Sequence, residues 1–166
     1  MKRLVSPFLI SRSGRSVSVV LISSSRARHA ALAKVAKTLG WELTFCASCR
    51  EGLEYLMQHR VPVVVCDECV SDGDWKVLME QMHGLEFPPN LIVIAAQPGD
   101  NLWAETFNWG AYDLLSAPYS PAEIYRLVSL ACDAKCREWS GAAAPKKPVA
   151  SYPAVAGASR AASQQA

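Results

Sequence analysis

The chain has 166 residues, of which 51% are hydrophobic and 19% are charged. This length suits one domain, and the apolar fraction is sufficient for a packed core, which excludes disorder of the whole chain. No apolar run approaches the roughly 18 residues that cross a bilayer, and the basic start lacks the apolar stretch of a secretory signal. We therefore expect a cytoplasmic protein with no membrane partner.

Charge is distributed unevenly along the chain. Residues 1–16 carry +4 and residues 141–166 carry +3, whereas the residues between them hold 10 basic and 15 acidic side chains. A nucleic-acid-binding domain concentrates Lys and Arg on its folded face, so we expect no nucleic-acid partner. The composition predicts a flexible basic segment over 1–15, a folded domain over 16–139 and a disordered Ala/Pro/Ser-rich tail over 140–166.

Apolar runs alternate with amphipathic stretches through the middle of the chain. Runs rich in β-branched residues predict strands, which we place at 16–22, 42–46, 62–66, 91–95 and 112–115. Helical spacing of apolar residues predicts helices, which we place around 30–39, 53–57, 75–82, 101–109 and from a capping box at 120–123 onward. This alternation is typical of an α/β fold with a doubly wound parallel sheet, whose ligand sites lie at the carboxyl ends of the strands.

Three segments of the predicted sheet resemble the receiver domain of response regulators (CheY-like). They are residues 66–74, 92–96 and 110–118, and the resemblance covers about residues 17–138. It implies a flavodoxin-like fold with five strands in the order 2-1-3-4-5 and five helices. It also implies a module of two-component phosphorelay signal transduction, in which Asp67 takes the position of the phosphoacceptor. The sequence has no Gly-rich phosphate loop, nucleophile elbow or catalytic Ser-His-Asp order, so we expect no enzyme.

The positions around Asp67 depart from the family's pattern. In the family an acidic pair follows the first strand, and here Ser23 and Ser24 hold these positions. The family uses a backbone carbonyl at the position of Cys69 and a hydroxyl residue at the position of Ala95. It also supplies a lysine before a proline, at the positions here held by Ala117 and Pro118. A phosphoryl group approaching a carboxylate needs Mg²⁺ and a lysine to neutralise the negative charges. We therefore expect a degenerate pseudo-receiver, phosphorylated poorly or not at all.

Charged residues near Asp67 in the sequence offer two possible compensations. Mg²⁺ is expected only if Glu68, Asp72 or Asp74 replaces the lost acids; otherwise we expect no cofactor. Arg26 or Arg28 is a candidate to replace part of the lysine charge.

Six cysteines stand in three pairs. Cys46, Cys49, Cys66 and Cys69 have the spacing of a four-cysteine zinc site. A helix and a buried strand separate the two pairs, unlike the hairpin of a zinc ribbon, so we favour free thiols over zinc. Cys132 and Cys136 lie one helical turn apart and are a candidate reactive pair, although we favour core or surface thiols.

The fourth predicted helix carries Trp103 and Phe107 at helical spacing i and i+4. The resemblance implies that this region forms a partner or dimer face, whereas packing in the core is the alternative. We expect a stand-alone receiver-like module that binds a histidine kinase, a phosphotransfer protein or another receiver domain by protein–protein interaction, and a homodimer is possible. The alternatives are a phosphorylation-independent scaffold and a cysteine-based metal- or redox-sensing protein.

Overall fold

A computed structural model describes residues 16–99 and 101–141. The expected basic segment, 1–15, and most of the expected tail, 142–166, lie outside the described residues. Five strands form one parallel sheet in the order β2-β1-β3-β6-β7. Their bounds are β1 (Ser18–Ile22), β2 (Glu42–Cys46), β3 (Val63–Asp67), β6 (Asn90–Ala95) and β7 (Asp113–Ser116). In chain order this is 2-1-3-4-5 within the sheet, which confirms the predicted flavodoxin-like fold.

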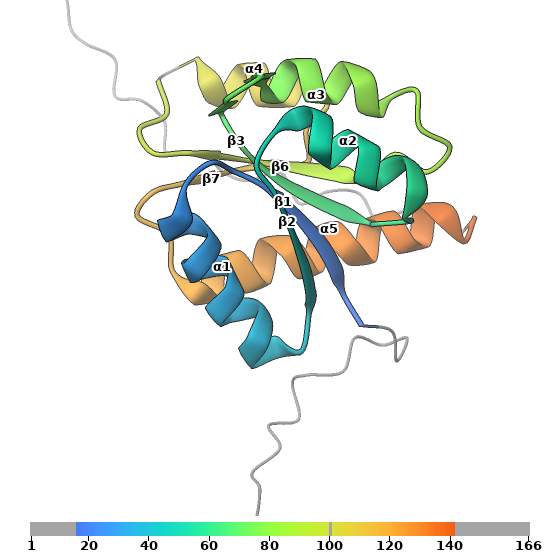
Figure 1. Cartoon of the computed structure of the whole chain (residues 1–166), viewed down its shortest axis with the longest axis horizontal. Coiled ribbons are helices and arrows are strands. Elements are labelled where there is room, and N and C mark those ends of the chain that lie inside the picture. Colours follow the sequence, from blue (N-terminus) through green and yellow to red (C-terminus); the bar gives the residue numbers. More distant parts are fainter. Residues whose placement is uncertain (1–15, 100, 142–166) are drawn as a thin grey trace, which may run out of the picture.

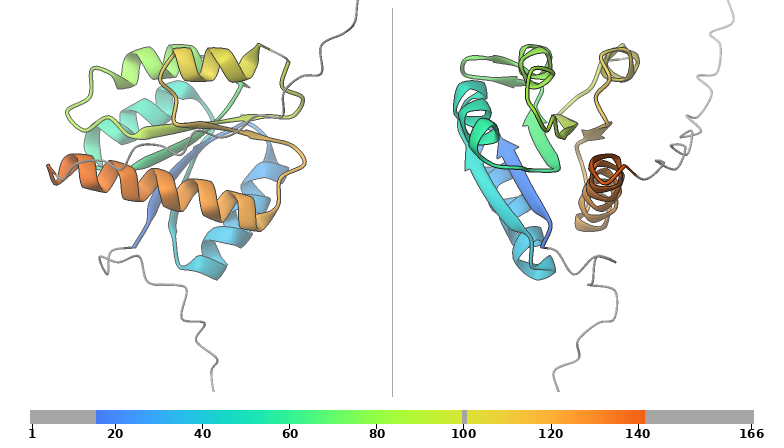
Figure 2. Two further views of the ribbon diagram at one scale, coloured as in Figure 1. Left: turned by 180° about the vertical axis from the view of Figure 1, so that it is seen from behind. Right: turned by 90° about the vertical axis from the view of Figure 1, so that its right-hand side faces the viewer.

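Five helices cover the two faces of this sheet. They are α1 (Arg26–Leu39), α2 (Cys49–Gln58), α3 (Trp75–Met82), α4 (Leu102–Asn108) and α5 (Pro121–Trp139). Helices α2, α3 and α4 lie on one face, and α1 and α5 lie on the other (Figures 1 and 2). The three-layer arrangement buries both faces of the central strands, as parallel sheets require.

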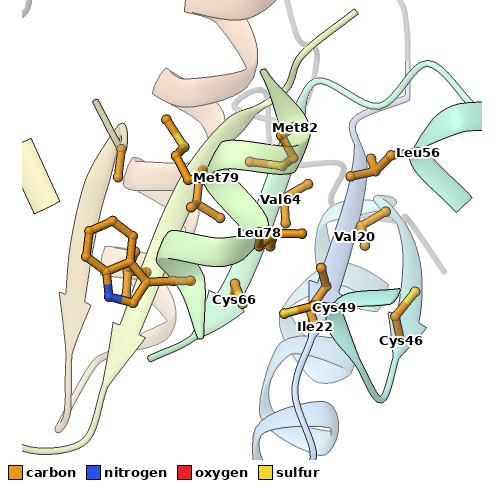
Figure 3. Close-up of a cluster of buried hydrophobic side chains, with 14 of the residues drawn as sticks. Val20, Ile22, Cys46, Cys49, Leu56, Val64, Cys66, Leu78, Met79 and Met82 are labelled. Atoms are coloured by element: carbon orange, nitrogen blue, oxygen red, sulfur yellow. The ribbon is translucent and has the colours of Figure 1, made fainter. Parts of the chain in front are cut away.

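Strand β1 shows how the sequence builds both cores at once. Successive side chains of a strand point to opposite faces of the sheet. Val19 and Leu21 therefore pack with the apolar residues of α1 and α5, whereas Val20 and Ile22 pack with those of α2 and α3. Figure 3 shows the second cluster, in which Leu78 of α3 lies over β3.

Helix α1 begins at Arg26, earlier than the apolar spacing predicts. Ser25 is its N-cap, and the Ser25 Oγ accepts a hydrogen bond from the main-chain N–H of Arg28. Such a cap satisfies an N–H group that has no partner within the helix. The early start places Arg28 in the first turn of α1, a short loop away from the end of β1.

A short antiparallel hairpin follows β3 and was not predicted. It consists of β4 (Cys69–Val70) and β5 (Gly73–Asp74), in which Cys69 pairs with Asp74. Two-residue strands carry too little periodicity to be recognised in a sequence. The hairpin nevertheless determines where Asp72 and Asp74 lie relative to Asp67.

Candidate functional site at the carboxyl ends of the strands

The register of the sheet gathers the sequence-predicted residues at one edge. Ile22 pairs with Cys66, so the next residues in each strand, Ser23 and Asp67, are neighbours. On the other side of β3, Asp67 pairs with Ile94, and Ala95 then pairs with the end of β7. The main-chain N–H of Ala117 donates to the Ala95 carbonyl at 3.0 Å. Ser23, Asp67, Ala95 and Ala117 thus lie along the carboxyl edge of the sheet.

Asp67 is buried at this edge, with only 3% of its surface exposed. Its Oδ2 atom accepts a 2.5 Å hydrogen bond from the Ser23 hydroxyl and lies 2.7 Å from Arg28 Nη1. Its Oδ1 atom is also buried and has no hydrogen-bond partner within the described residues. One oxygen of the carboxylate is therefore engaged by a cation and a hydroxyl, and the other is enclosed.

Ser23 is fixed by contacts of its own. Its hydroxyl oxygen accepts a 3.0 Å hydrogen bond from the main-chain N–H of Ser25 while its proton goes to Asp67. The Nε2 atom of His29 lies 2.7 Å from the Ser23 carbonyl, which can only accept, so this nitrogen carries the hydrogen. The loop between β1 and α1 is thereby held against the end of β3.

The two arginine candidates have different positions. Arg28 reaches Asp67, whereas Arg26 is exposed. A residue in the first turn after β1 lies near the strand end, and the long arginine side chain spans the remaining distance. The sequence identified both residues, and the early start of α1 distinguishes them.

Two of the three nearby acids cap helices. Asp72 accepts hydrogen bonds from the main-chain N–H groups of Arg50 and Cys49 at the start of α2. These bonds lower the pKa of Asp72, and the bond from Arg50 has the larger effect. Asp74 accepts from the N–H groups of Lys76 and Val77 at the start of α3. Both carboxylates are therefore directed to helix amides. Glu68 is half-buried, and its main-chain N–H donates to the Ile94 carbonyl.

The remaining predicted positions carry no charge at the site. Ala95 is buried, whereas Ser24, Cys69, Ala117 and Pro118 are exposed. The peptide bond between Ala117 and Pro118 is cis. Methyl groups at 95 and 117 provide neither a hydroxyl nor an ammonium group to a phosphoryl oxygen.

These residues do not fit a Mg²⁺ ion. Mg²⁺ takes near-octahedral oxygen coordination and binds through carboxylates. At this site a guanidinium group contacts the one engaged carboxylate oxygen. Across residues 16–99 and 101–141, no three side chains of the His, Cys, Asp or Glu type are grouped to hold a metal ion.

The four cysteines with zinc-site spacing are distributed over different environments. Cys46, Cys49 and Cys66 are buried, whereas Cys69 is exposed on the hairpin. The Cys49 thiol donates to the Asp74 carbonyl at 3.8 Å, and the Cys66 thiol donates to the Asp67 carbonyl at 3.2 Å. Figure 3 shows Cys49, at the start of α2, and Cys66, on β3, in the buried cluster.

Trp103 and Phe107 differ in burial. Trp103 packs partly buried against the core cluster under α2, α3 and α4, whereas Phe107 is 39% exposed. Only Phe107 therefore presents a large apolar area on α4. Trp109, at the end of α4, is partly buried and packs against Trp75 with ring centroids 6.2 Å apart.

No family model matches the sequence, and no curated protein matches it. Solved structures match the fold. The signal receiver domain of an HD domain-containing protein from Pseudomonas fluorescens Pf-5 has a TM-score of 0.70 and 20% identity, covering 79% of this chain and 97% of its own. A response regulator receiver domain protein (CheY-like) from Methanospirillum hungatei JF-1 has a TM-score of 0.67 and 17% identity, covering 75% and 99%. The beryllofluoride-activated NtrC4 receiver domain dimer has a TM-score of 0.66 and 19% identity, covering 71% and 98%.

The fold of this chain is therefore that of a receiver domain, and the resemblance seen in the sequence is confirmed at the level of the fold. Within the described ranges, no helix has the length and apolar character needed to span a membrane.

Proposed function

We propose that this chain is a receiver-like module of two-component signal transduction that acts by protein–protein interaction, with little or no phosphorylation of Asp67. The observation that carries the proposal is the buried carboxylate of Asp67, whose Oδ2 is held by Arg28 and Ser23. In this proposal the fold is used as a docking surface, and the ancestral acceptor is part of its interior.

Phosphoryl transfer to a carboxylate sets two requirements. The attacking oxygen must reach the phosphorus in line, and cations must neutralise the charge that develops on the phosphoryl oxygens. At Asp67 one oxygen is ion-paired and the other is buried. Positions 95 and 117 hold alanine, so the hydroxyl and the lysine that would contact the phosphoryl group are missing.

The partners in this proposal are a histidine kinase, a phosphotransfer protein or another receiver domain, and the module is not itself an enzyme. The exposed ring of Phe107 on α4 supports a contact at this helix, with a second copy of the chain as one occupant. The similar NtrC4 receiver domain is a dimer in its beryllofluoride-activated form. A cytoplasmic location belongs to the same proposal.

Intact-mass measurement after incubation with acetyl phosphate and Mg²⁺ tests the proposal. We expect the mass of the chain to stay unchanged under conditions in which an ordinary receiver domain, included as the positive control, gains one phosphoryl group. A stoichiometric adduct that disappears in the Asp67→Asn variant would overturn the proposal.

The Sγ atoms of Cys132 and Cys136 lie 4.0 Å apart on α5, which favours thiol-based redox sensing as a second candidate function. A hydroperoxide would oxidise the two thiols to a disulfide and itself be reduced to two molecules of water, or to water and an alcohol. Peptide mapping without reductant after peroxide treatment would then give a Cys132–Cys136 cross-link. Recovery of both thiols in the reduced form would exclude this candidate.

A further inference from the structure

Asp67 carries a negative charge inside the protein, and such a charge is costly unless a cation lies against it. Among the described residues, Arg28 is the basic side chain that forms an ion pair with Asp67. The Nη1 to Oδ2 distance of 2.7 Å is that of a charge-assisted hydrogen bond. The negative charge of the Asp67 carboxylate is therefore neutralised by the guanidinium group of Arg28.

The place of this cation is fixed by the fold. The Arg28 side chain is 24% exposed, so its guanidinium reaches inward from the first turn of α1. The cap at Ser25 and the hydrogen bond from His29 to Ser23 hold the loop from which α1 starts. The guanidinium is thus placed in advance and needs no rearrangement to meet Asp67.

Ser23 completes the exclusion of a metal ion. Its hydroxyl proton is donated to Asp67 Oδ2, and its oxygen accepts from the Ser25 N–H. A divalent cation at Oδ2 would have to displace both this proton and the guanidinium, and it would be repelled by the guanidinium at close range. It would gain no ligand from Asp72 or Asp74, because both carboxylates bind helix amides.

We propose that Arg28 is the resident counter-cation of Asp67 and, with Ser23, closes the carboxyl edge of the sheet to divalent cations. This inference rests on the proposed function and explains it by one ion pair. It follows that the scaffold retains a latent metal site. Removing the charge of Arg28 and placing an acid at position 23 sets two carboxylates side by side, an arrangement that a divalent cation neutralises.

Mn²⁺ binding, measured by electron paramagnetic resonance on the full chain, tests the inference. The variants are Arg28→Gln, Ser23→Asp/Arg28→Gln and, as a matched control, Arg26→Gln at the neighbouring exposed arginine. We expect no Mn²⁺ at Asp67 in the wild type or in Arg26→Gln. In the double variant we expect affinity at least about tenfold higher than in the wild type, because a carboxylate replaces a cation. Adding Asp67→Asn must abolish this gain.

Several outcomes overturn the inference. One is wild-type binding that equals that of the double variant and is lost on Asp67→Asn. Another is a folded double variant with no gain in Mn²⁺ affinity. If the double variant does not fold without metal, Arg28→Gln alone decides the question, because it too must bind Mn²⁺ more tightly than the wild type. Phosphorylation of wild-type Asp67 overturns the proposed function. If the wild type is not phosphorylated and the folded double variant does not bind Mn²⁺, only this inference is overturned and the proposed function stands.

Discussion

Asp72 Oδ1 accepts a 2.7 Å hydrogen bond from the main-chain N–H of Cys49. The second oxygen of the same carboxylate accepts from Arg50 at 2.9 Å. A side chain from the turn of the β4–β5 hairpin therefore caps the first turn of α2, next to the hydroxyl cap from Ser48. The hairpin that follows Asp67 is attached in this way to the neighbouring helix.

Asp72→Ala is expected to lower the free energy of unfolding by about 0.5–2 kcal/mol, because a helix cap is lost. The hydrogen bonds from Arg50 and Cys49 lower the pKa of Asp72 in the folded state, so the unfolded state binds the proton more tightly. The contribution is complete above the unfolded pKa of about 4 and is lost as the pH falls through the lower folded-state pKa. Urea unfolding at neutral and acidic pH should thus show a difference between wild type and variant that shrinks in acid. Asp133→Ala, at an exposed site on α5, serves as the control, and an equal pH dependence there would contradict the prediction.

A double-mutant cycle on Arg28 and Asp67 measures their coupling. Arg28→Gln leaves a buried carboxylate without its cation and is expected to cost about 2–4 kcal/mol, somewhat less than for a fully buried pair because Arg28 is partly exposed. Asp67→Asn in the Arg28→Gln background should restore part of this loss, since no buried charge remains. Chemical unfolding of the four proteins gives the coupling energy. Strictly additive effects would show that the two side chains do not interact in solution.

The cysteines are expected to differ in reactivity toward a thiol reagent in the native state. Cys69 is exposed and should react first. Burial raises the pKa of Cys46 to about 11 and that of Cys132 to about 12, which leaves little thiolate near neutral pH. We expect one fast phase that Cys69→Ser removes, and reaction of all six cysteines only after unfolding. A fast phase that survives in Cys69→Ser would place an accessible thiolate elsewhere.

Substitutions on α4 separate packing from partner binding. Trp103→Ala should lower the free energy of unfolding by about 1–3 kcal/mol, because the indole is partly buried against the core. Phe107→Ser should change it by about 1 kcal/mol or less while weakening self-association or partner capture. Unfolding curves and sedimentation of the same samples check both effects. Unchanged association in Phe107→Ser would exclude this part of α4 as an interface.

The fold could be predicted from the sequence because each strand of the sheet is a short apolar run. Val63, Val64 and Val65 lie in a strand that is buried on both faces, and a short run of β-branched residues is typical of such a strand. The capping box at Ser120 was equally direct, and the Ser120 hydroxyl accepts from the N–H of Glu123. These signals are local, so they need no knowledge of the three-dimensional arrangement.

The site was only partly predictable, since its contacts join residues distant in sequence. The position of Asp67 and its altered surroundings followed from the order of residues along the chain. The ion pair with Arg28 depends on where α1 begins, and the caps at Asp72 and Asp74 depend on a hairpin too short to predict.

Strand β3 has valines on both faces, so sliding it by one position against β1 would bury much the same apolar area. Hydrophobicity alone therefore distinguishes poorly between neighbouring alignments of these two strands. Only the alignment that sets Ser23 beside Asp67 unites the hydroxyl, the carboxylate and the guanidinium. The contact among Ser23, Asp67 and Arg28 therefore favours the native alignment of β1 and β3 over neighbouring alignments.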